Sequence, residues 1–348
     1  MPVLHWTLGV LALFLVQISV AATDSSPDPL FQGDDILSVR ITAPMATLLS
    51  DRPDDEELPG KLHYAEADGS IAEFDIEIRT RGRYRRQAHV CSFPPLRLDF
   101  KTSAVKNSLF HKQDKLKLVT HCQASSRYEQ ALLREYLVYR MLNVLTEKSY
   151  KVRMMLITYV DADDKLEDVT QHGFVIERDD RFAKRIGTQI LEIPKTSVKS
   201  IDPQHMNLGS VFQFMIGNTD FSPIRAAPGE SCCHNYELYG NEGESILAVP
   251  YDFDQSGFVD APHATPNDRF KLSSVRERLY RGRCANNEHL PATIAHFIDR
   301  RDEVTAVLNS LPPVSKSSLT MMSKYVDRFY SVITSERRIN KELTKACI

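Results

Sequence analysis

Residues 61–79 read KLHYAEADGSIAEFDIEIR. Asp68-Gly69 lies between two stretches of strand-forming residues, and an Asp-Gly pair in that position is a strong signal for a β-hairpin. In the second stretch apolar and charged side chains alternate, with Phe74, Ile76 and Ile78 set against Asp75, Glu77 and Arg79. This alternation predicts a strand with one buried and one wet face, and therefore an antiparallel sheet.

More stretches with strand character surround this hairpin, and one long helix interrupts them. We expect further strands at 36–41, 95–100, 115–120, 151–160 and 173–177. The helix is expected over 128–145, with Ser125 or Ser126 as its N-cap. Because it is apolar on more than one face, it should be largely buried. The sequence thus predicts an N-terminal lobe, 36–180, built as a mostly antiparallel sheet with one inserted helix.

The remainder, 181–348, has a different pattern, with helices and polar loops. A helix is expected at 207–216, short strands at 237–239 and 245–251, and two tail helices on either side of Leu311-Pro312-Pro313. The predicted fold class is therefore α+β with two lobes, the second being a mainly helical lobe that carries the functional loops.

The N-terminal segment has the pattern of an export signal. An apolar run over 6–20 contains no charged residue and ends in Val20-Ala21-Ala22, so 1–22 is predicted to be a signal peptide and 23–35 a flexible leader. A membrane anchor is the alternative, although a run of about 15 residues is short for a bilayer. No later run predicts a membrane span. The expected location is secreted, periplasmic or in the cell envelope.

The net charge and the cysteines limit which partners and which covalent or metal links the protein can have. The formal net charge is −3, without a basic run, which argues against nucleic acid as a partner. Six cysteines in an exported chain favour disulfides. We expect a Cys91–Cys122 bridge, because these residues open and close predicted strands, and a bridge from Cys232 or Cys233 to Cys284. Zinc binding by Cys232-Cys233-His234 is the alternative.

Polar residues concentrate in two loops of the second half. Gly217-Asn-Thr-Asp220 follows the 207–216 helix, and Asp252-Phe-Asp254 follows an apolar strand. Carboxylates at the end of a strand can hold a hard cation, and a second Asp nearby can orient a hydroxyl. Phosphoryl transfer needs this combination, because its catalysis is mainly positioning and charge neutralisation. The stretch 252–260 also matches several positions of a calcium-binding EF-hand loop, but position 12 is His263 and the preceding residues are strand-like.

These motifs occur in an order that resembles the CotH family of spore-coat-type atypical kinases. The resemblance rests on the following motifs: Arg81-Gly82, Lys115-Leu-Lys-Leu118, Leu133-Arg-Glu-Tyr-Leu137, Gly217-Asn-Thr-Asp220, Asn235-Tyr-Glu-Leu-Tyr239 and Pro250-Tyr-Asp-Phe-Asp254. It implies a protein-kinase-like fold and a nucleotide, ATP with Mg²⁺ or Mn²⁺, as cofactor.

The resemblance also implies a role for each site residue. Asp220 would be the catalytic aspartate, with Asn235, Asp252 and Asp254 on the metal. Lys117 or Lys115 would reach the nucleotide phosphates, paired with Glu135 or Glu129, and Gly82 would lie at the phosphate-covering turn. The expected function is phosphoryl transfer to a protein or another acceptor of the cell envelope. The alternative is a catalytically inactive pseudokinase that acts as a binding or structural module.

Overall fold

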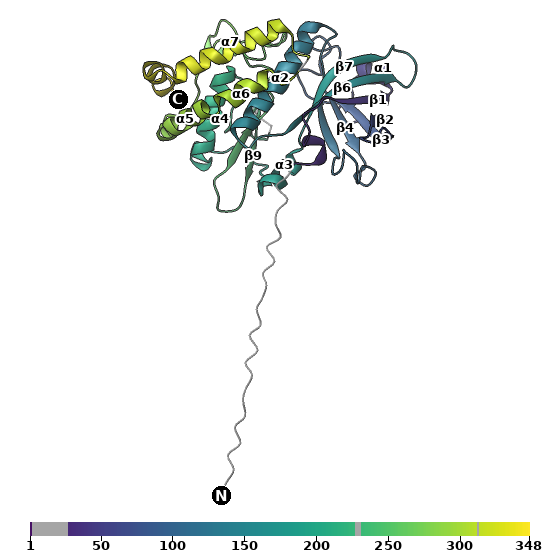
Figure 1. Cartoon of the computed structure of the whole chain (residues 1–348), viewed down its shortest axis with the longest axis horizontal. Helices are drawn as coiled ribbons and strands as arrows, with labels where there is room; N and C mark the ends of the chain where they lie inside the picture. Colours follow the sequence, from purple (N-terminus) through teal and green to yellow (C-terminus); the bar gives the residue numbers. More distant parts are fainter. Residues whose placement is uncertain (2–26, 227–230, 312) are drawn as a thin grey trace.

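The computed structural model describes residue 1 and residues 27–226, 231–311 and 313–348. The expected signal peptide, 1–22, thus lies outside the described residues apart from Met1. Figure 1 shows a strand-rich part and a helix-rich part side by side, with helix α2 (Ser126–Leu145) running between them. The position of α2 makes it the element that connects the two parts.

Seven strands form a closed barrel in the order β1-β2-β3-β4-β5-β7-β6. The strands are β1 Leu37–Ala43, β2 Leu58–Ala65, β3 Ile71–Thr80, β4 Leu96–Phe100, β5 Lys115–Val119, β6 Val152–Asp161 and β7 Val169–Ile176. Neighbours are antiparallel except for β1 and β6, which pair in parallel from Leu37–Met155 to Ala43–Asp161. The buried residues Ile76 and Ile78 of β3 point into the barrel core, as their alternation predicts.

The barrel contradicts the expected fold class. We expected a two-lobed, protein-kinase-like α+β fold whose N-terminal lobe is a mostly antiparallel sheet with one inserted helix. The strand-rich part is instead a closed barrel of mixed strand direction. The parallel pairing of β1 with β6 is the reason, because it joins the two ends of the sheet and leaves no open edge. Alternation within one strand predicts its buried face but does not determine which strands close the sheet.

The helices and a small second sheet complete the described chain. The α-helices are α1 Met45–Asp51, α2 Ser126–Leu145, α3 Asp179–Ile186, α4 Pro203–Ile216, α5 Leu290–Asp299, α6 Arg301–Leu308, α7 Lys316–Ile333 and α8 Glu336–Ile339. The second sheet has the order β10-β9-β8, with β8 Gln189–Ile190, β9 Tyr236–Gly240 and β10 Leu247–Pro250. Within the described ranges, every helix is too short or too polar to cross a membrane.

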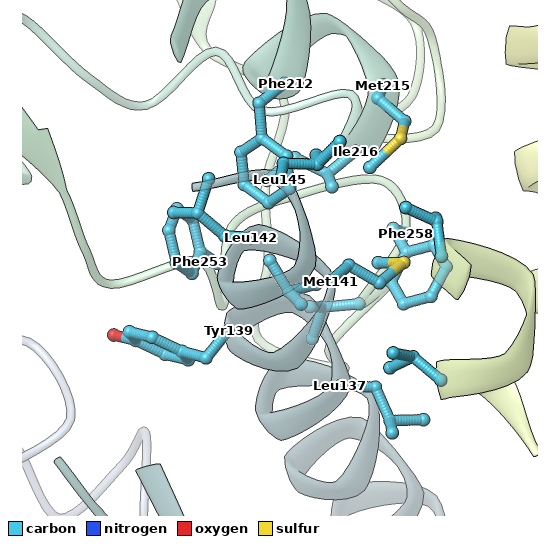
Figure 2. Packing of buried hydrophobic residues seen from close by; sticks show 14 of the residues in the cluster. Leu137, Tyr139, Met141, Leu142, Leu145, Phe212, Met215, Ile216, Phe253 and Phe258 are labelled. Carbon is cyan, nitrogen blue, oxygen red and sulfur yellow. The ribbon is translucent and has the colours of Figure 1, made fainter. Parts of the chain in front are cut away.

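Helix α2 is buried on several sides, as its sequence predicts. Figure 2 shows its apolar side chains against Phe212 and Ile216 of α4 and against Phe253 and Phe258 of the loop after β10. Its other side packs on the barrel, where Tyr136 and Tyr139 contact the ring of Phe174 on β7. One helix therefore fixes the barrel and the functional loops relative to each other.

The disulfides agree with one expectation and contradict another. Cys91 and Cys122 are bonded, as predicted. Cys284 is bonded to Cys347, and Cys232 to its neighbour Cys233, so the expected bridge from Cys232 or Cys233 to Cys284 is wrong. The zinc alternative is also wrong, because zinc needs free thiolates and both sulfurs are in a disulfide.

The segment before the barrel is more ordered than expected over its described part. Of the predicted flexible leader, 23–35, residues 27–35 are described. Leu30 is fully buried, and the Asp28 carboxylate accepts two hydrogen bonds from Arg181 of α3 at 2.8 and 2.7 Å. These contacts hold residues 28–31 against the end of the barrel.

A buried ion pair anchors α3 beside the barrel and gives a test of the fold. Arg185 donates to both oxygens of Glu177 at 2.8 Å, and both side chains are nearly inaccessible. Replacing Glu177 with Gln leaves the guanidinium without its buried counter-charge, so we expect a loss of about 3–5 kcal/mol in the free energy of unfolding. Urea denaturation measures this loss.

The matched control is Glu147→Gln. Its carboxylate also lies near Arg185, at 3.8 Å, but the side chain is 78% exposed. An exposed pair contributes only about 0–1 kcal/mol, so this variant should unfold like the wild type. Equal losses in the two variants would contradict the structural role of the Glu177–Arg185 pair.

Candidate functional site

A pocket of about 730 Å³ lies where the loop after β3 meets the loops of the helix-rich part. The residues that line it include Arg81, Gly82, Arg83, Tyr84, Arg85, Asp220, His234, Asn235, Tyr251, Asp252, Asp254, Asn267 and Asp268. Four residues predicted from sequence for catalysis or metal binding, Asp220, Asn235, Asp252 and Asp254, are therefore brought together. Their chemical roles stay predictions.

Asp220 follows the C-terminal end of α4. Gly217 ends this helix with a φ of 64°, and a Cβ at this position would collide with the hydroxyl of Tyr325, so only glycine fits. The side chain of Asn218 then accepts a hydrogen bond from the backbone N–H of Asp220 at 2.9 Å. The turn directs the Asp220 carboxylate into the pocket.

Two neighbours from the segment before β9 hold the Asp220 carboxylate. The Asn235 amide donates to the Asp220 backbone carbonyl at 2.6 Å and to its carboxylate at 3.1 Å. The ring Nε2 of His234 lies 2.8 Å from the other carboxylate oxygen. Asn235 has a φ of 55°, a left-handed conformation that Asn tolerates better than most residues. Asp220 is thus fixed in orientation while its side chain stays 35% exposed.

Asp252 and Asp254 follow directly on β10. The backbone N–H of Asp252 donates to the hydroxyl of Tyr139 on α2 at 2.9 Å, which ties the start of this loop to the central helix. Burial raises the pKa of Asp252, and the nearby carboxylates of Asp254 and Asp220 raise it further. Burial also opposes the charge on Asp254, but Arg85 and His263 outweigh it and lower the pKa of Asp254. The two carboxylates are therefore unequal in their affinity for protons.

Arg85 lies at the centre of this acidic group. Its guanidinium is 3.3 Å from Asp254, 3.4 Å from Asp252 and 3.5 Å from Glu135 of α2. Burial opposes the positive charge, but the three carboxylates together raise the pKa of Arg85 above its usual value. Burial raises the pKa of Glu135 to about 8, although Arg85 acts against this shift. The expected partner of Glu135 was a lysine, and the structure has an arginine there.

The two lysines expected at the phosphates occupy different environments. Lys117 reaches a small cavity next to the pocket, but its ammonium lies 2.8 and 3.1 Å from the carboxylate oxygens of Asp179. The predicted pairing of Lys117 with Glu135 or Glu129 is thus wrong. Lys115 is exposed on β5, opposite Asp99 of β4, and is not among the pocket's lining residues.

The remaining residues expected at the site are Gly82 and those of the loop that resembles an EF-hand. Gly82 lines the pocket with a φ of 81°, which suits the turn that was expected to cover phosphates. In the 252–260 loop, Asp254 contacts Arg85 and His263, and Asp260 contacts Arg276 at 3.1 Å. The loop follows strand β10 and not a helix, and its twelfth position is His263 where an EF-hand has a bidentate Glu, which argues against a calcium loop of the EF-hand type.

Three residues of the site were not singled out from the sequence: Arg85, His234 as a partner of Asp220, and His263 as a partner of Asp254. A signal for the first was present in the run RGRYRR at 81–86, where every second residue is an arginine. Arg81, Arg83 and Arg85 all line the pocket.

Comparison with known proteins assigns neither a family nor a function to this chain. No protein-family model matches the chain, and no curated protein matches it either. The interpretation of the site therefore rests on its own geometry.

The raised pKa of Glu135 predicts a pH-dependent stability. The folded protein keeps a proton on Glu135 up to about pH 8, whereas the unfolded chain releases it near its ordinary pKa of about 4.3. The folded state then binds more protons, so stability falls as pH rises through this window. We expect the free energy of unfolding to fall less steeply in Glu135→Gln than in the wild type.

Urea denaturation at about pH 5.5, 7.0 and 8.5 measures these slopes. Glu147→Gln serves as the control, because this exposed carboxylate lies outside the site. The free energy of unfolding of this variant should change with pH as steeply as that of the wild type. Identical slopes in Glu135→Gln and the wild type would contradict the predicted protonation of Glu135.

Proposed function

We propose that the pocket binds a nucleotide, ATP with Mg²⁺ or Mn²⁺, and transfers a phosphoryl group to a hydroxyl acceptor. One observation carries the proposal: Asp220, Asn235, Asp252 and Asp254 come from three separate loops and line one pocket opposite Arg81 and Arg85. Phosphoryl transfer requires acids for a metal, cations for phosphates and an oriented acid for the acceptor. The order of motifs that resembles the CotH family of atypical kinases supports the same activity.

The donor set fits a metal shared between protein and nucleotide. Among the described residues, no group of three or more His, Cys, Asp or Glu side chains is arranged to hold a metal ion. Mg²⁺ is commonly held by one or two carboxylates, with substrate phosphates and water as the other ligands. Asp252 and Asp254 supply two carboxylates that already share a cation, the guanidinium of Arg85. The side-chain oxygen of Asn235 is the third candidate ligand.

The remaining groups have distinct roles in this proposal. A bound divalent metal would neutralise charge on the phosphates. Asp220 accepts a hydrogen bond from the acceptor hydroxyl and orients it, while Asn235 and His234 keep the carboxylate in place. Arg81 supplies a positive charge on the barrel side of the pocket, where a phosphate would lie. The acceptor is a protein or another component of the cell envelope, and the protein acts after export, with which its disulfides are compatible.

A second candidate is a binding or structural module without catalysis. One observation favours it: Arg85 contacts both candidate metal carboxylates, and Lys117 is paired with Asp179. In such a module the ion pairs would be permanent and no nucleotide would bind. The two candidates therefore differ in a simple binding measurement.

Thermal unfolding with MnCl₂ and ATP tests the proposal. A ligand at about 100 times its Kd stabilises the protein by about 2.7 kcal/mol, so the melting temperature of the wild type should rise. Asp252→Asn should abolish this rise, since a metal carboxylate is lost. Asp220→Asn should keep it but lower ATP hydrolysis by about 100-fold or more.

Asp260→Asn is the matched control for Asp252→Asn. Both residues belong to the same loop and both have a positive φ, but Asp260 contacts Arg276 and does not line the pocket. Its melting temperature with MnCl₂ and ATP should rise like that of the wild type. If the wild type shows no rise, the phosphotransferase proposal fails and the binding module becomes the better hypothesis.

A further inference from the structure

The guanidinium of Arg85 is shared among three carboxylates and is not locked onto one. Each of its nitrogens faces a different acid: Nη1 faces Glu135, Nη2 faces Asp252 and Nε faces Asp254, at 3.3 to 3.5 Å. Charge-assisted hydrogen bonds of this type are normally about 2.7–2.9 Å long. The three contacts are therefore long, and the side chain can change partners without breaking an optimal pair.

Three carboxyl groups surround the guanidinium of Arg85, and one of their oxygens has no partner among the described residues. Arg85 is only 12% exposed, and the Glu135 side chain that faces it is 3% exposed. Among the described residues, Oε1 of Glu135 has no hydrogen-bond partner. A buried polar oxygen without a hydrogen-bond partner is costly, so a ligand group that supplies one at this point would be stabilised.

Lys117 is already committed elsewhere and does not supply that partner. Its ammonium contacts both oxygens of Asp179, and the hydroxyl of Tyr150 donates to the same carboxylate at 3.0 Å. Arg85 is the cation in direct contact with Glu135, and Arg81 lines the same small cavity. Arg85 takes the position beside Glu135 that the resemblance to the CotH family implies for a lysine.

We propose that Arg85 occupies the carboxylates of Asp252 and Asp254 when no metal is present, and moves to Glu135 and the nucleotide phosphates when a divalent cation binds. This inference rests on the proposed function, because it names the residue that couples metal and nucleotide binding there. Two cations repel each other at the same carboxylates, so a metal on Asp252 and Asp254 displaces the guanidinium. Glu135 remains as its acidic partner, and a phosphate is the natural second one.

Competition at the same carboxylates has two measurable consequences. A metal alone binds weakly, because the Arg85 guanidinium that it displaces keeps Glu135 as its one partner. Metal and nucleotide together bind cooperatively, because the displaced guanidinium gains the phosphates as a partner. Coupling between two ligands is reciprocal, so each should raise the affinity for the other by the same factor.

The test is a titration with MnCl₂ alone, in which electron paramagnetic resonance reports free Mn²⁺. Arg85→Gln removes the competing cation and should bind Mn²⁺ about tenfold more tightly than the wild type. Glu135→Gln removes the alternative partner of Arg85, holds the guanidinium on Asp252 and Asp254, and should bind Mn²⁺ more weakly. Lys115→Gln, which removes an exposed positive charge on the barrel, is the matched control and should equal the wild type.

A second titration repeats the series with a non-hydrolysable ATP analogue at saturation. The analogue should raise the Mn²⁺ affinity of both proteins, because its phosphates also bind the metal, and the factor should be about tenfold larger in the wild type than in Arg85→Gln. Unchanged or weaker Mn²⁺ binding by Arg85→Gln in the first titration would overturn the proposal. Tighter Mn²⁺ binding by Glu135→Gln would also overturn the proposal, and this measurement does not depend on whether Arg85→Gln folds. If Arg85→Gln binds Mn²⁺ tightly but no variant binds the analogue, the competition stands and the proposed phosphotransferase function fails.

Discussion

The parallel contact between β1 and β6 determines where the loops of the barrel can lie, because it closes a sheet whose other pairings are antiparallel. Closure fixes each strand against two neighbours, so the end of β3 at Thr80 cannot shift relative to β5 and β7. The loop that follows carries Arg81 and Arg85 and is fixed a second time by the Cys91–Cys122 disulfide. The cationic wall of the pocket is therefore attached to a rigid frame.

Helix α2 transmits this rigidity to the loop after β10, which carries Asp252 and Asp254. Arg134 donates from inside the helix to the backbone carbonyl of Val259 at 2.7 Å and to the hydroxyl of Ser318 on α7 at 2.8 Å. Tyr139, one turn further on, accepts from the backbone of Asp252. Polar residues in a buried helix are thus used to position loops of the helix-rich part, and the same helix brings Glu135 to Arg85.

Local patterns in the sequence predicted local features, and long-range contacts account for what was missed. The α2 helix begins at Ser126 with Ser125 as its N-cap, close to the expected start, because its apolar pattern and polar boundary are both local. The closed barrel and the partners of Arg85 have no such signal. Arg85 meets acids from α2 and from the loop after β10, and only the assembled fold brings them together. Lys117 was misassigned for the same reason, since Asp179 lies on α3.

Comparison of two buried ion pairs in this protein shows why the pocket's charges favour a ligand site over a purely structural cluster. Arg185 and Glu177 form a two-pronged pair with both contacts at 2.8 Å, the short geometry of a strong charge-assisted pair. Arg85 faces three acids at longer distances, and one acid keeps an oxygen without a partner in the described chain. A buried oxygen without a partner is unfavourable in a protein in which no ligand reaches it. The same arrangement is favourable in a pocket that a metal and a phosphate enter together, because the carboxylates of Asp252 and Asp254 and the guanidinium of Arg85 then each gain a partner.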